Sequence, residues 1–464
     1  MDAHRVVGDR AIRLNQGIEQ CQAVGIDDGD VDDLGPSAQS GSLGVEIDDG
    51  WIGSNIRGPS KGTLSILRLL AKTHRGLLPA VLNLSSRTES RTASRRSAYA
   101  PGQPRLATEV DMPIVPELDA FIRRMPKAEI HLHLEGSVRP STVLDLSRRH
   151  GTSLPATTEE ELAQYFTFRD FDHFIECYIA VCNTLRTPED FERIVRELGE
   201  DCAAQNIRYV EVHFNPATNV RKRGLDFRAM LDGMNAGRRD ARDRFGVEMR
   251  WIADGVRDEG PEHRSVARTV EWIAALDPSE GVVGLGLGGS EVGFPPTLYQ
   301  REFAMAREAG LHVVAHAGET TGPQTIIDSL NLLGAERIGH GIRAIEDPSL
   351  VARLALDQIP LEVCPTSNVC TRVTATMQEH PFPLLDRAGV LVTINSDDPP
   401  LFGTTLTDEF RVLADHWGYR SSDLQRIAGN AVRASFLPER DRAALLGVFR
   451  AETEILREDL GVSD

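Results

Sequence analysis

The chain contains the stretch Lys127-Ala-Glu-Ile-His131-Leu-His133-Leu-Glu135-Gly136-Ser137, in which two histidines end a short apolar run. In a β-strand, residues i and i+2 point to the same face. His131 and His133 therefore direct their imidazoles into one space, which is a natural start for a divalent metal site. The alternative is two ordinary histidines on a half-exposed strand, so the rest of the chain has to decide between the two.

From Met112 onward, short β-like runs alternate with amphipathic helical stretches, which is the pattern of a parallel α/β fold. We expect eight strands, at Ala128–His133, Ile207–Phe214, Met249–Val256, Val282–Leu287, His312–His316, Arg337–His340, Leu361–Val363 and Val390–Ile394. Eight such units predict a (β/α)8 TIM barrel, in which active sites lie where the strands end in loops.

Helices are expected between the strands. Thr187-Pro188-Glu189-Asp190 opens one with an N-cap residue, a proline at the first helical position and early acids, and this helix should run to about Ala204. We also expect helices at Pro261–Ala275 and Leu298–Ala309, and a helical C-terminus at Ser421–Ala434 and Pro438–Leu460.

Polar residues with chemical capability follow several of these strands. The fifth strand ends in His316-Ala-Gly-Glu319, where His316 can join the two histidines and Glu319 is free for proton chemistry. The eighth ends in Asp397-Asp398, of which one acid can bind a metal while the other faces a substrate. The sixth ends in His340, flanked by glycines that allow a close approach to the backbone.

Three histidines and a carboxylate with one position open for water are typical of a catalytic zinc site. Such a metal lowers the pKa of its bound water and makes hydroxide available as a nucleophile. Alone, Asp397-Asp398 fits a helix cap and His340 fits a buried core histidine. Together, metal-competent groups at the ends of strands one, five and eight favour the metal site.

Two other sequence motifs are weaker evidence of function. Gly284-Leu-Gly-Leu-Gly-Gly289 fits G-x-G-x-x-G, but Pro295 and Pro296 follow closely, so no phosphate-binding helix is expected. The glycines better suit a flat ring lying against bare backbone. His133-Leu-Glu135 fits the H-x-E of the cytidine-deaminase class, whose P-C-x-x-C is missing.

Two further segments are assigned structural roles. Cys364-Pro-Thr-Ser-Asn368 closes the seventh strand, and we expect a turn there, although its polar residues also suit ligand binding. The aromatic segment Phe166–Tyr178 is expected in the core, with a lid or wall over an aromatic substrate as the alternative.

The composition is that of an acidic globular protein. The 464 residues are 41% hydrophobic, and 69 acidic against 51 basic residues give a formal net charge of −18. Because nucleic-acid phosphates and anionic membranes repel such a protein, we expect neither as a partner. No apolar run of about 18 residues occurs. Because no apolar stretch follows the first residues, we expect no signal peptide. The six cysteines form no C-x-x-C pair, so we expect a reducing, cytoplasmic location.

Residues 1–111 differ in composition from the rest of the chain. An acidic cluster at Asp27–Asp33 precedes Ser/Gly-rich stretches and a basic Ser/Arg tract, and the segment Leu64–Leu84 has an apolar, helical character. No catalytic motif occurs here. We expect a poorly structured or disordered extension, or a segment upstream of the true start at Met112. Residues 112–464 have a suitable length for one barrel domain.

The chain carries six motifs in a set order: K-A-E-I-H-L-H-L-E-G-S (127–137), G-L-G-L-G-G-S-E (284–291), H-A-G-E (316–319), R-I-G-H-G (337–341), C-P-T-S-N (364–368) and N-S-D-D-P (395–399). Together they resemble the adenosine deaminase family of the amidohydrolase superfamily. The resemblance covers essentially all of residues 112–464, and six motifs in the family's order make it highly specific.

This resemblance implies which residues act in catalysis. One zinc ion per chain would be bound by His131, His133, His316 and Asp397. Glu319 would donate a proton to purine N1 and make C6 electrophilic. His340 would orient the zinc-bound water and help deprotonate it, and Asp397 would act beside them as ligand and catalytic group.

The resemblance also implies the substrate contacts. Asp398 would hydrogen-bond purine N7, the backbone N–H of Gly289 would meet N3, Glu135 would reach the ribose hydroxyls, and His133 would border the substrate. The implied reaction is hydrolytic deamination of a small 6-aminopurine at C6, with release of ammonia. The sequence makes no prediction of the oligomeric state.

The chain departs from the family pattern at one loop. Many adenosine deaminases read D-L-A-G-D-E where this chain has Gly286-Leu-Gly-Gly-Ser290-Glu291, so two acids are replaced. The continuation Glu291-Val-Gly-Phe-Pro-Pro296 also resembles relatives acting on free adenine or on modified adenosines, one of which deaminates 6-aminodeoxyfutalosine in menaquinone synthesis. Loss of the two acidic side chains would open room for a larger substituent. Adenosine is the first expectation because it is the commonest substrate of the family.

Two other functional classes stay open. A non-catalytic purine-binding relative would be expected to have lost the proton donor or a metal ligand, and Glu319 and all four ligands are present. A metal-dependent amidase or esterase would not need both Glu319 and Asp398.

We predict that translation starts at Met112, because the catalytic motifs all follow it. N-terminal peptide mass spectrometry of the native protein should then find a peptide that begins at this residue. Abundant peptides from residues 1–100 would contradict the prediction.

Overall fold

The computed structural model describes residues 41–47, 50–56, 114–257 and 264–462. The chain divides into two units, Met1–Pro104 and Arg105–Asp464. In the first, β1 (Gly41–Ile47) and β2 (Gly50–Ile56) pair antiparallel, which the sequence patterns did not predict. The expected helix at Leu64–Leu84 lies outside the described residues.

The second unit is built on eight parallel strands, each paired with the next along the chain. They are β3 (Lys127–His133), β4 (Ile207–Phe214), β5 (Glu248–Val256), β6 (Val282–Gly288), β7 (His312–Ala317), β8 (Arg337–His340), β9 (Leu361–Val363) and β10 (Val392–Ile394). The last strand returns to the first through its following loop, where the backbone N–H of His133 donates to the carbonyl of Asp397 at 2.9 Å. The predicted (β/α)8 barrel is therefore confirmed.

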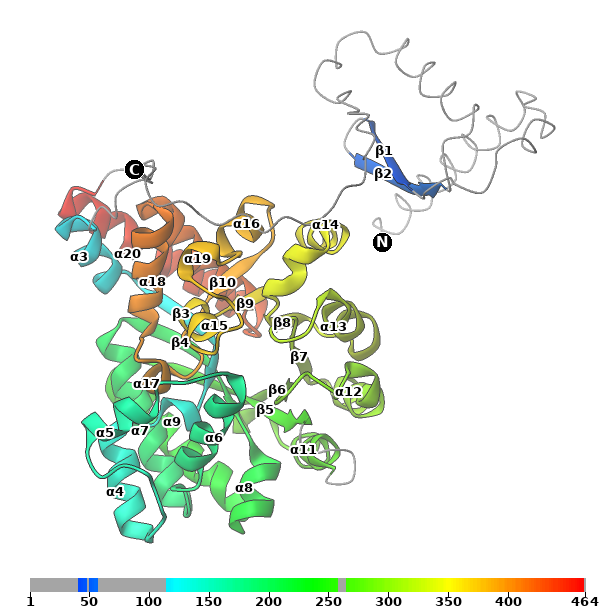
Figure 1. Cartoon of the computed structure of the whole chain (residues 1–464). Helices are drawn as coiled ribbons and strands as arrows, with labels where there is room; N and C mark the ends of the chain where they lie inside the picture. The colour runs from blue at the N-terminus through cyan, green and yellow to red at the C-terminus, as the bar shows by residue number, and fades with distance from the viewer. Residues whose placement is uncertain (1–40, 48–49, 57–113, 258–263, 463–464) are drawn as a thin grey trace, which may run out of the picture. The chain divides into compact units, whose positions relative to one another are not determined.

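Helices surround the strands on the outside of the barrel (Figure 1). The α-helices are α3 (Pro116–Arg124), α4 (Pro140–His150), α5 (Glu159–Tyr165), α6 (Phe171–Cys182), α7 (Pro188–Ala204), α8 (Pro216–Arg223), α9 (Phe227–Phe245), α11 (Ser265–Ile273), α12 (Gln300–Glu308), α13 (Pro323–Asp328), α14 (Pro348–Asp357), α15 (Pro365–Cys370), α16 (Phe382–Arg387), α17 (Pro399–Phe402), α18 (Leu406–Trp417), α19 (Ser421–Ala434) and α20 (Glu439–Leu460). The chain thus adds α19 and α20 after the eighth barrel strand, and α20 packs on α19 and α3.

The bounds predicted from the sequence agree closely with the observed bounds of these elements. Each of the eight expected strands is present, with its ends within two residues of the expected ones. Helix α7 begins at Pro188 as expected, and the backbone N–H of Thr187 donates to the Asp190 carboxylate at 2.9 Å. Helix α11 begins at Ser265 among the described residues, and the start expected at Pro261 lies outside them.

The strands form the centre of the core because both of their faces are covered. All residues of β8, β9 and β10 are buried, as is typical of a parallel sheet inside a ring of helices. Polar side chains inside such a barrel need partners, and they concentrate at the carboxyl ends of the strands. This end of the barrel positions the candidate site.

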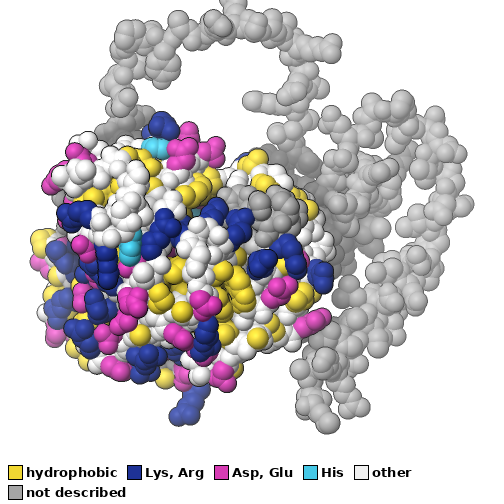
Figure 2. All heavy atoms as spheres, turned by 90° about the horizontal axis from the view of Figure 1, so that it is seen from below, with side chains coloured by type: hydrophobic (Ala, Val, Ile, Leu, Met, Phe, Trp, Pro, Cys, Tyr) yellow, Lys and Arg dark blue, Asp and Glu magenta, His cyan; other side chains and the backbone are white. Residues whose placement is uncertain are grey.

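The surface of the protein mixes both signs of charge. Figure 2 shows Lys and Arg side chains interspersed with Asp and Glu over one face, together with apolar side chains. Among the described residues, no helix is both long enough and apolar enough to span a membrane.

Candidate metal centre and active site

Four side chains meet at the carboxyl end of the barrel. His131 and His133 come from β3, His316 from β7, and Asp397 from the loop after β10. Their ligand atoms all lie within 4.8 Å of one another. The Asp397 Oδ1 atom is 3.4 Å from His131 Nε2 and 3.3 Å from His133 Nε2, and the Nε2 atoms of His133 and His316 are 3.3 Å apart.

These spacings fit four protein ligands around one metal ion. Bonds of about 2.0–2.1 Å to a central ion imply about 3.3–3.4 Å between neighbouring ligands, which matches the observed distances. The buried Nε2 atom of His131 has no hydrogen-bond partner, as a free ligand atom would. The four predicted ligands are thus brought together in a set suited to a divalent metal ion.

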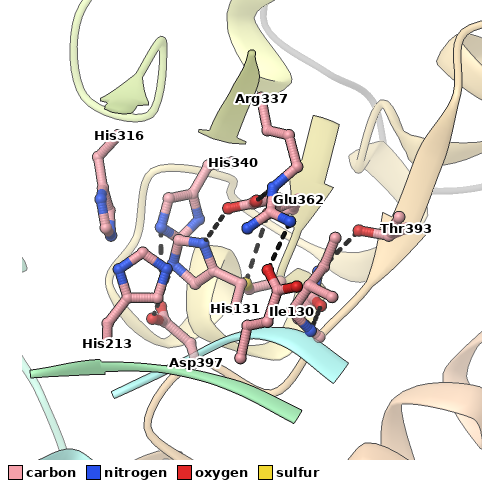
Figure 3. Close-up of polar contacts among 12 residues, drawn as sticks. Ile130, His131, His213, His316, Arg337, His340, Glu362, Thr393 and Asp397 are labelled. Carbon is pink, nitrogen blue, oxygen red and sulfur yellow. Dashed lines mark hydrogen bonds and ion pairs between the residues drawn. The ribbon is translucent and has the colours of Figure 1, made fainter. Parts of the chain in front are cut away.

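A buried ionic chain supports His131 from the side away from the ligand atoms (Figure 3). The Nδ1 atom of His131 donates to Glu362 Oε2 at 2.7 Å. Glu362 also pairs with Arg337 at 2.6 Å, and Arg337 pairs with Glu211 at 2.6 Å. Burial opposes ionisation of Glu362, but the charge of Arg337 outweighs it and lowers the carboxyl pKa to about 2. The proton of His131 is therefore held on Nδ1, and Nε2 faces the other ligands.

A second carboxylate supports His133. Asp254 of β5 accepts a hydrogen bond from His213 Nδ1 at 2.9 Å, and its other oxygen lies 3.6 Å from His133 Nδ1. A Cβ atom at Gly286 would lie 1.8 Å from Asp254 Oδ1. The space that the sequence analysis expected to be open at Gly286 is thus filled by Asp254, and this part of that expectation is wrong.

The loop after β7 positions Glu319 through Glu291. The Glu291 carboxylate accepts hydrogen bonds from the backbone N–H groups of Gly318, Glu319 and Thr320 at 2.8–2.9 Å. Burial raises the pKa of Glu319 well above its ordinary value, and the charge of Asp397 adds to this effect. Glu319 is therefore suited to hold a proton, as a general acid must.

His340 faces the same centre from β8. Its Nε2 atom lies 3.8 Å from Glu319 Oε2 and 3.8 Å from Asp397 Oδ2. On its other side, Asn368 Nδ2 donates to His340 Nδ1 at 3.1 Å, and His380 Nε2 donates to Asn368 Oδ1 at 3.2 Å. This network places the imidazole proton of His340 on Nε2, and burial lowers its pKa to about 4.

Asn368 lies in a segment for which a turn was expected. Residues Pro365–Cys370 instead form α15, so the prediction of a turn is wrong. Proline is favoured at the first position of a helix, which explains why the chain continues into a helix here. The short helix brings Asn368 against His340.

Asp398 is buried beside Asp397 and lines the same cavity. Its pKa is raised well above the ordinary value by burial and by the charge of Asp397, and its Oδ1 atom has no hydrogen-bond partner. A Cβ atom at Gly136 would lie 1.6 Å from that oxygen. Glycine at this position therefore leaves room for the Asp398 carboxyl group.

Glu135 already has several partners. Its carboxylate accepts from Asn219 Nδ2 at 2.8 Å, from the backbone N–H of Asn215 at 3.0 Å and from Tyr178 Oη at 3.3 Å. The side chain is buried and still lines the cavity. Any ligand hydroxyl that meets Glu135 has to share the carboxylate with these groups.

The cavity beside the candidate metal centre contains about 860 Å³ of non-protein space, part of which is open to solvent. Predicted site residues line it at its polar end, namely His133, His316, Glu319, His340, Asp397 and Asp398. Gly289 borders it as well, with a φ of 82° that favours glycine. Helix α6 supplies an apolar wall that includes Phe171 and Phe174, so the aromatic segment serves both the core and the cavity.

Comparisons with known proteins agree with this geometry. The adenosine deaminase family model matches residues 126–451. The aminodeoxyfutalosine deaminase of Streptomyces coelicolor is 45% identical over 336 residues, which cover 72% of this chain and 86% of that protein. The crystal structure of an adenine deaminase from Arthrobacter aurescens matches with a TM-score of 0.68 and 34% identity, covering 71% of this chain and 99% of that chain. A zinc-bound amidohydrolase from Burkholderia ambifaria matches with a TM-score of 0.70 and 27% identity, covering 77% and 97%.

We predict that Glu362→Gln weakens the binding of a divalent metal by about 10- to 100-fold, because a neutral partner orients and charges His131 less strongly. Competition with a chromophoric chelator, using Zn²⁺ or Co²⁺, would measure the change. Glu308→Gln on the exposed end of α12 is the matched control. Equal affinities in the two variants would contradict the assigned role of Glu362.

Proposed function

The chain belongs to the adenosine deaminase family, and we propose that it is a zinc-dependent hydrolase that replaces the 6-amino group of a purine nucleoside with oxygen and releases ammonia. The observation that carries this proposal is the joint presence of a four-residue ligand set, a buried acid and a second raised-pKa acid in one cavity. The reaction needs water as its only co-substrate: the water supplies the oxygen and two protons, of which one leaves with ammonia and one ends on purine N1.

The donor set fits zinc. Three imidazole nitrogens and one carboxylate are ligands that zinc prefers in catalytic sites. Bound by His131, His133, His316 and Asp397, the ion would lower the pKa of a water molecule toward neutrality and so supply a nucleophile.

The protein residues hold and move the protons. Glu319, protonated because it is buried, would donate to purine N1 and make C6 more electrophilic. His340 was expected from the sequence to orient the water and help deprotonate it. With Asn368 donating to Nδ1, the ring carries its proton on Nε2, so we propose that it orients an oxygen beside C6 by donating a hydrogen bond. Asp398, whose pKa is raised by burial, can donate to N7. The N–H of Gly289 is proposed to bind N3.

We propose 6-aminodeoxyfutalosine as the substrate. The 45% identity to an aminodeoxyfutalosine deaminase supports this choice over adenosine, which the sequence analysis placed first. The cavity supports it too, because it extends from the metal centre along the apolar wall of α6. Adenine is the second candidate, supported by the match to a solved adenine deaminase.

A cytoplasmic location is part of the proposal. The cysteines that the structure describes, Cys177, Cys182, Cys202, Cys364 and Cys370, are all free thiols, which suits a reducing compartment.

We predict that Glu319→Gln keeps its metal and lowers kcat by about 10²- to 10⁴-fold, since glutamine cannot deliver the proton to N1. Metal analysis and steady-state kinetics on one preparation would measure both quantities. His131→Ala should instead lose metal and activity together. Near-normal turnover by Glu319→Gln would refute its role as the acid.

We predict that the zinc-loaded protein releases ammonia from 6-aminodeoxyfutalosine with a higher kcat/KM than from adenosine or adenine. A coupled ammonia assay over this panel would measure the preference. A higher kcat/KM for adenine would support the second candidate, and no ammonia from any 6-aminopurine would overturn the proposed reaction.

A further inference from the structure

The cavity extends beyond the groups that serve the purine. Its wall also includes Ile175 and Ile179 of α6 and two basic residues, Lys222 and Arg223, at the end of α8. The deamination chemistry described above uses none of these four side chains. An apolar wall that leads to cationic groups is suited to a ligand with an apolar spacer and an acidic end.

Arg223 is held in place by neutral partners. Its Nη1 atom donates to Asn219 Oδ1 at 2.8 Å, and its Nη2 atom donates to Asn183 Oδ1 at 3.3 Å. Its Nε atom is buried and has no hydrogen-bond partner. Among the residues that the structure describes, no carboxylate forms an ion pair with this guanidinium. Arg223 therefore keeps a positive charge and an unused donor in the cavity wall.

Asn219 separates Arg223 from the nearest acid of the site. Its amide nitrogen donates to Glu135 Oε1 at 2.8 Å, and its amide oxygen accepts from Arg223. A carboxylate at this position would neutralise the guanidinium, whereas an amide connects the two groups and leaves the charge of Arg223 uncompensated. The guanidinium thus lies two hydrogen bonds from Glu135, the residue assigned to the sugar.

Neither the helix dipole nor a general surface potential accounts for the position of this charge. Arg223 lies in the last turn of α8, where the helix dipole favours a cation, and exposed Arg221 satisfies that preference equally well. A broad positive field does not account for it either, since acidic residues outnumber basic ones by 69 to 51 in the chain.

We propose that Arg223 forms an anion-binding subsite, which selects substrates whose sugar carries an acidic group on an apolar, ring-containing substituent at the 5′ position. A guanidinium binds a carboxylate through two parallel hydrogen bonds, and the aromatic wall of α6 accepts the spacer. The subsite rests on the proposed function, because it requires the purine to lie at the metal centre.

The test compares three probes on the zinc-loaded full chain. The first, 5′-deoxy-5′-(3-carboxyphenylthio)adenosine, carries both the ring and the acid. The second, 5′-deoxy-5′-phenylthioadenosine, carries only the ring, and the third, adenosine 5′-monophosphate, carries an acid without the ring. The ratio of kcat/KM for the first probe to that for the second should fall by about 10- to 100-fold in Arg223→Gln.

Arg221→Gln, in the same helical turn, is the matched control and should leave this ratio unchanged. An unchanged ratio in Arg223→Gln, or an equal fall in Arg221→Gln, would overturn the subsite. A preference for adenosine 5′-monophosphate over the carboxyphenyl probe, lost in Arg223→Gln, would overturn the ring-containing spacer.

The binding of the first two probes to zinc-loaded Glu319→Gln, measured by calorimetry, separates this proposal from the proposed function. Suppose that the wild type releases no ammonia, but that zinc-loaded Glu319→Gln binds the acidic probe more tightly than the phenyl probe and loses this preference when Arg223→Gln is added. The proposed reaction is then wrong and the subsite is supported. Turnover without such a preference sinks the subsite and leaves the reaction intact.

Discussion

The buried carboxylate of Asp397, which meets three histidines, is the interaction on which the rest of the site depends. Burial by itself lowers the pKa of an imidazole, yet the nearby carboxylates of Asp397 and Glu362 raise the pKa of His131 to about 10. The hydrogen bond with Asp397 likewise raises that of His133 to about 9. This point of the barrel therefore attracts positive charge, which can arrive as protons or as a divalent cation that displaces them. The ion pairs behind His131 strengthen this attraction for positive charge, because they place the ionised carboxylate of Glu362 against Nδ1 of the His131 ring.

The barrel fold brings together site residues that are far apart in the sequence. His131 and Asp397 belong to the first strand and to the loop after the last, and they become neighbours only because the sheet closes on itself. Glycine makes the approach possible: a Cβ atom at Gly339 would lie 2.9 Å from His131 Cε1, and one at Gly136 would overlap Asp398. His340 and Asp397 also adopt positive φ values of 57° and 64°, which a surrounding structure must hold in place. Closure of the barrel and the absence of side chains at these glycines are thus both needed to bring His131, Asp397 and Asp398 close together.

The fold, and the four residues that meet at the candidate metal site, could be predicted from the sequence because both follow local rules. Apolar runs mark buried strands, and polar residues at the carboxyl ends of parallel strands converge on one end of a barrel. The supporting residues follow no local rule. Glu362 and Asp254 lie inside buried strands, where an isolated acid signals a partner but does not identify it. Asn368 was assigned to a turn because its partner, His340, belongs to a different strand. Pairing across strands is visible only in three dimensions.

One such pairing, between Gly286 and Asp254, changes what the glycine-rich loop implies about the size of the substrate. Where many relatives have an acid, this chain has Gly286, and Asp254 on the neighbouring strand fills the same space, 1.8 Å from where a Cβ atom would lie. A side chain at position 286 would therefore collide with Asp254, whose carboxylate lies beside His133 and His213. The glycine-rich loop therefore gains no volume at this point, and its sequence is a poor guide to the size of the substrate. Side chains of α6 and α8 also border the cavity, and they are the part of its wall that the glycine-rich loop does not describe.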